Sequence, residues 1–279
     1  MKKILKKLSK IMCLALVLCL CILSVGCGSK DKNESALKAI KDKKVLVVGT
    51  APGYPPFEFA TSKDGNSKVV GADIDLAQKL ADKIGVKLEI KSMEFDALLP
   101  ALQAGKIDIA ITAMTPTEER KKAVDFSQVY FDGTNSVIIS DSNKSKLANE
   151  DDLKNLKIGV QKGSTQEIYA KNKLKAKTVK SLPAVPDLVS DLKNGNIDAV
   201  VVSTVVGQIN VKQYQGVKLA QGLELKSYSG GEQAAMAFKK GNNKELIQQA
   251  NNLIKELKDS GEYQKILDKN IEIASQTSK

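Results

Sequence analysis

The chain has 279 residues, a formal net charge of +11 and no histidine. Without histidine there can be no Ser-His-Asp triad, Cys-His pair or ordinary zinc site, so an enzyme would need carboxylate, lysine or tyrosine chemistry. Beyond the N-terminus the basic residues are dispersed among 32 acidic ones, and the aromatic content is only 4%. We therefore expect no nucleic-acid partner, no metal and no cofactor.

The N-terminus predicts secretion. Five lysines in the first ten residues precede an apolar run over 11–23, which is shorter than the roughly 20 residues of a membrane-spanning helix. The run ends in LSVGC at Cys27, which resembles the lipobox of bacterial lipoproteins. That resemblance implies a signal peptide over 1–26, lipid attachment to Cys27 and an anchor on the extracytoplasmic face of the cell membrane. A plain signal-peptidase site with an incidental cysteine is the alternative.

The mature chain would have Cys27 as its only cysteine, because the other three lie inside the apolar run. No internal disulfide could then form, so stability must come from a packed core. We interpret residues 27–43 as the lipidated cysteine and a flexible tether. The remainder is long enough for one core or two smaller ones.

Strands and helices alternate along the first half of the mature chain. Apolar runs predict strands at 45–49 and 86–90, and an amphipathic pattern over 72–84, ended by Gly85, predicts a helix between them. Another helix is expected over 95–103. This order is typical of a parallel sheet with covering helices.

The second half repeats this alternation. Strands are predicted at 156–160 and near 177–180, and helices from Thr165, over 185–193 and after Thr204. The segment LQAGKID, ending at Asp108, returns as LKNGNID, ending at Asp198, each time before an apolar strand. Each copy combines a helix end, a glycine stop and a buried strand, which indicates two similarly built halves.

The C-terminal segment predicts a return to the first half. A helix with one apolar face is expected over 244–257, and a last helix after Gly261 to about residue 269. Residues 224–239 are interpreted as strands between the lobes. The chain would then cross between the lobes twice, and such a two-strand hinge permits closure around a ligand.

We therefore predict an α/β fold of two lobes, each a mainly parallel sheet flanked by helices, joined by a two-strand hinge. Lobe 1 is expected from 44–132 and 234–279, and lobe 2 from 133–233. Ligands of such sheets bind beyond the carboxyl ends of the strands. The loops expected at that edge are 51–57, 112–115, 161–165 and 203–204.

One of these loops begins the segment TAMTPTEERKKAVDF. In it Thr115, Pro116 and Glu118 form a capping-box pattern, which predicts a short helix whose first N–H groups attract an anion. Arg120 follows within about one turn, and a guanidinium can hold a carboxylate through two parallel hydrogen bonds. An ordinary solvated helix start with a surface arginine is the alternative.

Together these segments resemble the bacterial extracellular solute-binding proteins of family 3, the polar amino-acid receptors of ABC importers. The resemblance covers nearly the whole mature chain and implies the type II fold of periplasmic binding proteins. The matching segments are GTAPGYPPFEF (49–59), GADIDLAQKLADKIG (71–85), 95–131 with its TPTEER, IGVQKGSTQEIY (158–169), GNIDAVVVS (195–203) and AMAFKKGN (235–242).

The resemblance also implies which residues bind the ligand. Tyr54 and Phe95 match two aromatic positions that enclose the ligand side chain. Thr115 and Arg120 match the groups that hold an α-carboxylate. Gln161 matches a position that contacts the ligand side chain from the second lobe. The full expected set is Tyr54, Phe95, Thr112, Met114 through its nearby backbone, Thr115, Arg120, Gln161, Thr165 and Ser203.

The chain departs from its relatives where an ammonium should be neutralised. Many members of the family have an acid at the position of Ser203, and a second acid at the position of Ala51. A buried ammonium without a carboxylate would meet a serious desolvation cost. Either the cleft binds a ligand without this ammonium, or a carboxylate from another position neutralises it. Glu58 and Glu232 are the candidates for such a carboxylate.

We expect a monomeric, lipid-anchored receptor that closes on an amino acid or related small carboxylate and delivers it to an ABC permease. No catalytic residue is expected. The alternatives are a dehydratase of the cyclohexadienyl type on the same fold, and a ligand-sensing or adhesin lipoprotein.

Overall fold

The structure is a computed structural model that describes residues 35–63, 66–142, 147, 149–223, 225 and 231–276. The expected signal peptide and Cys27 lie outside these residues and stay predictions. Within the described ranges no helix is long and apolar enough to cross a membrane. The expected tether needs one correction, since Ala36–Lys43 forms helix α2 and buries Leu37 and Ile40 on one side of it.

Lobe 1 is built on a five-stranded sheet in the order β4-β1-β5-β14-β6. Strand β1 runs parallel to β4 and β5, and β14 runs antiparallel to β5 and β6. The strands are β1 (Val45–Thr50), β4 (Lys87–Ser92), β5 (Ile109–Ala110), β6 (Val124–Phe126) and β14 (Ala237–Lys239). The outer hairpin β2 (Phe59–Lys63) and β3 (Asn66–Val70) completes the lobe.

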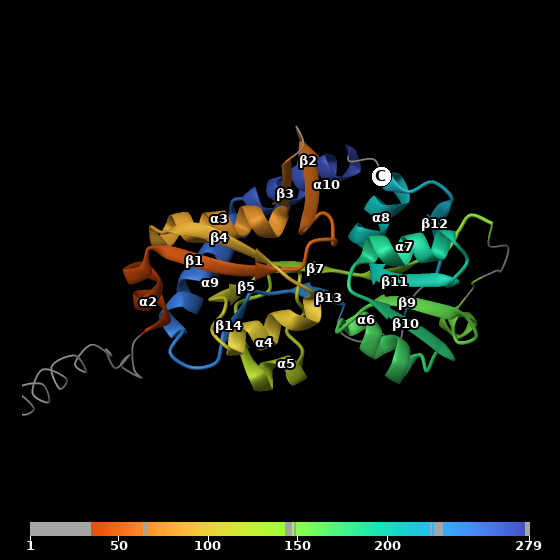
Figure 1. The fold of residues 1–279 in the computed structure, drawn as a ribbon, viewed down its shortest axis with the longest axis horizontal. Helices are drawn as coiled ribbons and strands as arrows, with labels where there is room; N and C mark the ends of the chain where they lie inside the picture. The colour runs from red at the N-terminus through yellow and green to blue at the C-terminus, as the bar shows by residue number, and fades with distance from the viewer. Residues whose placement is uncertain are drawn as a thin grey trace, which may run out of the picture. The chain divides into compact units, whose positions relative to one another are not determined.

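Helices cover both faces of this sheet because side chains alternate along β1. Leu46 and Val48 pack in one core with helices α3 (Ala72–Ile84) and α9 (Lys244–Asp259), whereas Val47 packs with α4 (Leu98–Gln103) on the other face. The short helices η1 (Phe95–Ala97) and α5 (Glu118–Ala123) flank α4 in the sequence. In Figure 1, α3 and α4 lie on opposite sides of the sheet.

Lobe 2 repeats the plan with a sheet in the order β10-β9-β11-β8-β12. Strand β9 runs parallel to β10 and β11, and β8 runs antiparallel to β11 and β12. The strands are β8 (Asn135–Ser140), β9 (Lys157–Gln161), β10 (Thr178–Leu182), β11 (Ala199–Ser203) and β12 (Val217–Leu219). The helices are η2 (Glu150–Leu153), α6 (Thr165–Ile168), the π-helical turn η3 (Tyr169–Lys173), α7 (Val185–Lys193) and α8 (Thr204–Gln213).

The chain passes between the lobes twice. Strand β7 (Phe131–Gly133) leads into lobe 2, β13 (Glu232–Ala234) leads back, and the two pair antiparallel (Figure 1). The strand after each crossing, β8 or β14, is the one that runs antiparallel in its sheet. The predicted mainly parallel sheets and two-strand hinge are thus confirmed, while the residue boundaries of the lobes stay a proposal.

The repeated LxxGxID segment has the same structure in both lobes. The Asp108 carboxylate accepts the backbone N–H of Val47 at 2.7 Å, and the Asp198 carboxylate accepts that of Lys157 at 2.8 Å. In each lobe the buried isoleucine immediately before this Asp, Ile107 or Ile197, packs on a glycine of the neighbouring strand, Gly49 of β1 or Gly159 of β9. The prediction of two similarly built halves is therefore confirmed.

The C-terminal helices reach both lobes. Helix α9 packs against α3, and α10 (Glu262–Gln276) packs against α3 and also against α8 of lobe 2. The Gln213 side-chain amide donates to the backbone carbonyl of Ala274 at 2.7 Å, and Phe59 and Ile209 bury the same helix end. The last helix is longer than the predicted end near residue 269, because its final turns pack on this second lobe.

Candidate functional site

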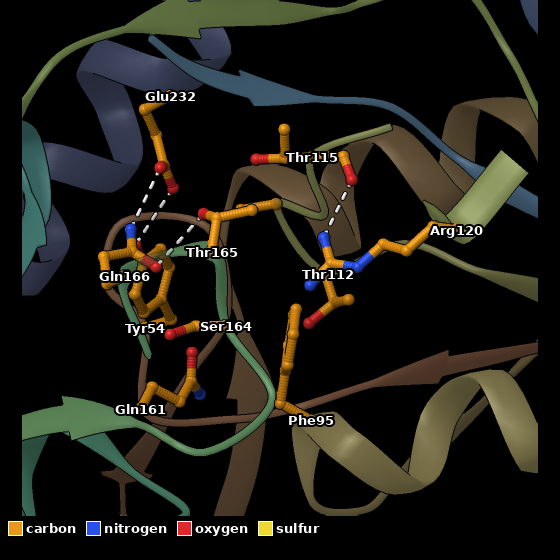
Figure 2. Close-up of a pocket in the computed structure, with 11 residues that line it drawn as sticks. Tyr54, Phe95, Thr112, Thr115, Arg120, Gln161, Ser164, Thr165, Gln166 and Glu232 are labelled. Atoms are coloured by element: carbon orange, nitrogen blue, oxygen red, sulfur yellow. Dashed lines mark hydrogen bonds between the residues drawn. The ribbon is translucent and has the colours of Figure 1, made fainter. Parts of the chain in front are cut away.

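A cavity lies between the lobes at the carboxyl ends of β1, β5 and β9. Its volume is about 240 Å³, including the part open to solvent. Both lobes contribute loops to it, and the returning strand β13 contributes one residue (Figure 2). The lining residues are Tyr54, Phe95, Thr112, Ala113, Thr115, Arg120, Gln161, Ser164, Thr165, Gln166 and Glu232.

Arg120 forms one side of the cavity (Figure 2). Its guanidinium carbon lies 5.3 Å from the centroid of the Phe95 ring, which is a cation–π contact. One Nη donates to the backbone carbonyl of Thr115 at 2.8 Å, and the other donates to that of Gly163, in lobe 2, at 3.0 Å. A guanidinium has five N–H donors in a rigid fork. These bonds orient the fork across the gap between the lobes.

The helix that carries Arg120 begins later than predicted. Helix α5 starts at Glu118, and the Thr117 hydroxyl caps it by accepting the backbone N–H of Arg120 at 3.2 Å. Thr115 lies two residues before this cap, and its carbonyl accepts the N–H of Thr117 at 2.9 Å. The predicted helix start is thus corrected from Thr115 to Thr117, while carboxylate binding at this segment stays a prediction.

Two buried carboxyl groups, those of Glu58 and Asp73, accept hydrogen bonds from the loop that follows β5. The Thr112 hydroxyl donates to Glu58 at 2.8 Å, and Asp73 accepts the N–H of Ala113 at 2.6 Å and the hydroxyl of Tyr130 at 2.8 Å. Burial raises the pKa of Asp73 to about 7 and that of Glu58 well above its ordinary range. Ala113 has φ 44°, a strained left-handed conformation for a residue with a side chain, and these bonds hold it there.

Lobe 2 closes the cavity with the loop between β9 and α6. Gly163 has φ 75°, and a Cβ placed there would lie 2.9 Å from the Cβ of Asp96 in lobe 1, so only glycine allows this close approach. The neighbouring Lys162 forms an ion pair with Asp96 at 2.8 Å. Ser164 caps α6 by accepting the N–H of Glu167 at 3.1 Å. The two lobes are therefore in direct contact at this side of the cavity.

Glu232, on the crossing strand β13, forms the side of the cavity opposite Arg120 (Figure 2). Its side chain is 3% exposed. The Tyr54 hydroxyl donates to one carboxylate oxygen at 3.1 Å, and the Gln166 amide donates to the other at 3.0 Å and to Asn135 at 2.8 Å. Burial raises the pKa of Glu232 to about 7, although these hydrogen bonds and the charge of Arg120 lower it.

The structure brings seven of the expected site residues to this cavity and leaves two outside its lining. The Met114 side chain is buried in the core of lobe 1, and its backbone carbonyl accepts the N–H of Ala235 at 3.0 Å. Ser203 is fully buried, with its backbone N–H 3.4 Å from the Tyr54 hydroxyl. Neither residue is part of the cavity lining. Ala51 is also buried in the core of lobe 1.

Sequence reasoning missed three lining residues, Ala113, Ser164 and Gln166. Ala113 and Ser164 lie within two of the loops expected at the sheet edge. Gln166 lies one residue beyond its loop, in the first turn of α6, where its burial among Tyr54 and Glu232 leaves no local sequence signal. Among the described residues no group of three or more cysteine or acidic side chains is arranged to hold a metal ion.

Comparison with known proteins gives concordant matches. The model of the bacterial extracellular solute-binding proteins, family 3, matches residues 46–273. The arginine-binding extracellular protein ArtP of Bacillus subtilis is 33% identical over 261 residues, covering 93% of this chain and 96% of that protein. A probable histidine-binding protein of Campylobacter jejuni is 36% identical over 249 residues, covering 88% and 92%.

A solved structure agrees with these sequences. The amino acid ABC transporter substrate-binding protein of Streptococcus pneumoniae, bound to L-arginine, superposes with a TM-score of 0.81 at 37% identity, covering 85% of this chain and 98% of that chain. None of the three proteins is named as an enzyme, so they favour a binding protein over the dehydratase alternative. The matched segment includes both lobes and the hinge, and the chain therefore belongs to the bacterial extracellular solute-binding proteins of family 3.

Proposed function

We propose that this protein is the substrate-binding component of an ABC importer for amino acids, with Arg120 as the group that binds the α-carboxylate. The guanidinium at the cavity wall, held by Thr115 and stacked on Phe95, is the observation that carries the proposal. A fork fixed in this way binds a carboxylate bidentately with little further loss of freedom. The similar proteins named for arginine and histidine support an amino acid as the ligand.

The remaining expected residues have complementary roles in this proposal. Tyr54 and Phe95 offer aromatic surface to the ligand side chain. Thr112 and Thr115 line the carboxylate end from lobe 1, and Thr165 lies across from them on lobe 2. The Gln161 amide donates to the carbonyl of Pro183 at 3.1 Å. In this proposal Gln161 contacts the side chain of the ligand from lobe 2.

The mechanism we propose is a shift of population between an open and a closed arrangement of the lobes. The ligand binds both lobes only when they are closed, so it favours the closed form by its differential affinity. The closed protein is then recognised by a membrane permease. Processing at the LSVGC segment and a lipid on Cys27 would keep the monomeric receptor at the outer surface of the membrane.

The test is calorimetric titration of the ligand-free protein with a panel of amino acids that begins with L-arginine and L-histidine. Arg120→Ala should weaken the best ligand at least about 30-fold, since removal of one partner of a closely bonded charge pair costs about 2 kcal/mol or more. Lys122→Ala is the matched control, because Lys122 is on the same helix and its side chain is 73% exposed. It should change the affinity by less than about twofold.

Two outcomes would contradict the proposal. One is a panel in which no amino acid binds the wild-type protein. The other is an Arg120→Ala protein that retains the wild-type affinity and its circular-dichroism spectrum. A sensor or adhesin that binds the same ligand would pass this test, and transport of the ligand by cells lacking only this protein distinguishes the importer role.

A further inference from the structure

The cavity has one acidic side chain among its lining residues, and no part of the proposed carboxylate site uses it. Glu232 is nearly fully buried, and both of its oxygens accept hydrogen bonds from neutral donors, Tyr54 and Gln166. An ionised carboxylate whose bonded donors are neutral loses most of its hydration, and the Arg120 charge, which lowers the pKa of Glu232, belongs to a guanidinium that donates to other groups. Such an arrangement is costly unless a cation completes it.

Glu232 also has capacity for another partner. A carboxylate can accept about four hydrogen bonds. The Tyr54 hydroxyl donates to one oxygen of Glu232 and the Gln166 amide to the other, and the Asn135 side chain also lowers the pKa of this carboxyl group by hydrogen bonding. Both amide hydrogens of Gln166 are committed, one to Asn135 and one to Glu232. The donors therefore orient the carboxylate, which also lines the cavity and has capacity for a further donor.

The cation nearest to this group in the site is Arg120, but it is held elsewhere. Its two Nη atoms donate to the carbonyls of Thr115 and Gly163. Figure 2 shows the guanidinium and Glu232 on opposite sides of the cavity. The cavity thus has a fixed positive end and a fixed negative end, which is the charge pattern that complements a zwitterion.

We propose that Glu232 binds a cationic nitrogen of the ligand and determines that this receptor accepts amino acids with such a group in reach of the hinge. This inference rests on the proposed function. The inference places on β13 the carboxylate that the family resemblance led us to expect at the positions of Ala51 and Ser203. Because β13 is one of the two strands that connect the lobes, a cation there binds where the lobes move least and stays bound in both arrangements.

A consequence follows for the pH dependence of binding. The groups that face Glu232 are Tyr54, Gln166, Asn135 and Arg120. Arg120 stays charged, and the amides do not titrate, so Glu232 is the group among them that changes protonation near neutral pH. With a pKa of about 7 in the free protein, a cation must displace its proton, and the affinity should fall about tenfold from pH 8 to pH 6. At pH 7 binding should release roughly half a proton.

The experiment is titration calorimetry with L-arginine at pH 6, 7 and 8, repeated at pH 7 in buffers of different ionisation enthalpy. Wild-type protein should show the tenfold fall and the proton release. Glu232→Gln, which keeps the shape and the hydrogen-bonding partners, should bind at least about 30-fold more weakly at pH 8 and release no proton. Glu58 and Asp73 titrate in both proteins, so the difference between the two isolates Glu232.

One analogue of arginine identifies the nitrogen that Glu232 contacts. If Glu232 meets the α-ammonium, 5-guanidinopentanoate, which is arginine without that group, should bind wild type and Glu232→Gln equally weakly. If it meets the guanidinium, this analogue should retain the difference between the two proteins. Glu89→Gln is the matched control, because it removes an acid whose side chain is 52% exposed on edge strand β4. It should leave affinity and proton release unchanged.

The outcomes separate the inference from the proposed function. If wild type binds arginine but Glu232→Gln binds it equally well at every pH, the inference is wrong and the carboxylate site at Arg120 is unaffected. If wild type binds another amino acid instead, the same comparison is made with that one. If no amino acid binds, both are wrong.

Discussion

Glu232→Gln should stabilise the ligand-free protein at pH 8, although we expect it to impair binding. The wild-type side chain is 3% exposed and its pKa is about 7, against an ordinary value of 4.5. A carboxyl group with a raised pKa in the folded state stabilises the fold while it is protonated. That stabilisation is complete below about pH 4.5 and is lost as the pH rises to 7, because the unfolded chain then ionises more easily.

The magnitude follows from the two pKa values. Their difference corresponds to about 3 kcal/mol of unfolding free energy at high pH, of which some 2 to 3 kcal/mol develops between pH 5 and pH 8. Glutamine remains neutral throughout, and its amide can still accept from Gln166 and donate to Tyr54. The stability advantage of the variant over wild type should therefore grow by that amount over this pH range.

The assay is urea unfolding at 25 °C with linear extrapolation at pH 5, 6, 7 and 8. Both proteins must first be unfolded, dialysed and refolded, since a ligand retained at a hundred times its dissociation constant adds about 2.7 kcal/mol. Asp73 and Glu58 add the same pH dependence to both proteins and cancel in the comparison. An advantage of Glu232→Gln that is constant from pH 5 to pH 8 would refute the reasoning, because it would mean that Glu232 does not titrate differently in the fold.

Two further predictions concern the core and the anchor. Gly49→Ala and Gly159→Ala should each lower the unfolding free energy by about 1 to 3 kcal/mol in urea titrations, because the new Cβ would lie 2.4 Å from the Cδ1 of Ile107 or Ile197. Their effects should add to within about 0.5 kcal/mol in the double variant, and a neutral effect at either position would contradict the equivalence of the lobes. Cys27→Ser in the full chain should abolish labelling by radioactive palmitate and release the protein from the membrane fraction. Persistent labelling of the variant would disprove the proposed lipid site.

The fold could be predicted because its signals are local. Helix α3 coincides with the predicted 72–84, since its apolar period and Gly85, with φ 76°, define both its face and its end. The repeated LxxGxID segments predicted matching halves because each depends on contacts within one lobe. Carboxyl ends of parallel strands meet at one edge by geometry, so the loops of the cavity could also be anticipated.

Local sequence patterns failed where two residues could each cap the same helix, and where the direction of a side chain depends on packing. The segment TPTEER allows a helix cap at Thr115 or at Thr117, and in the structure the helix is capped by Thr117. Met114 stands in a loop at the ligand edge, yet its side chain is 1% exposed because it fills the core of lobe 1. Sequence spacing does not specify either choice.

By itself, the sequence determined the two-lobed α/β architecture and the family, and it pointed to Arg120 as a candidate ligand-binding residue, because periodicity and short motifs act over a few turns of chain. Only the tertiary structure decided where the negative charge of the cavity lies. Tyr54 and Glu232 are 178 positions apart, and they meet because the chain crosses between the lobes twice. Their contact depends on the pairing of β7 with β13. These strands are far apart in the sequence, so no local pattern near Tyr54 or Glu232 predicts that they meet.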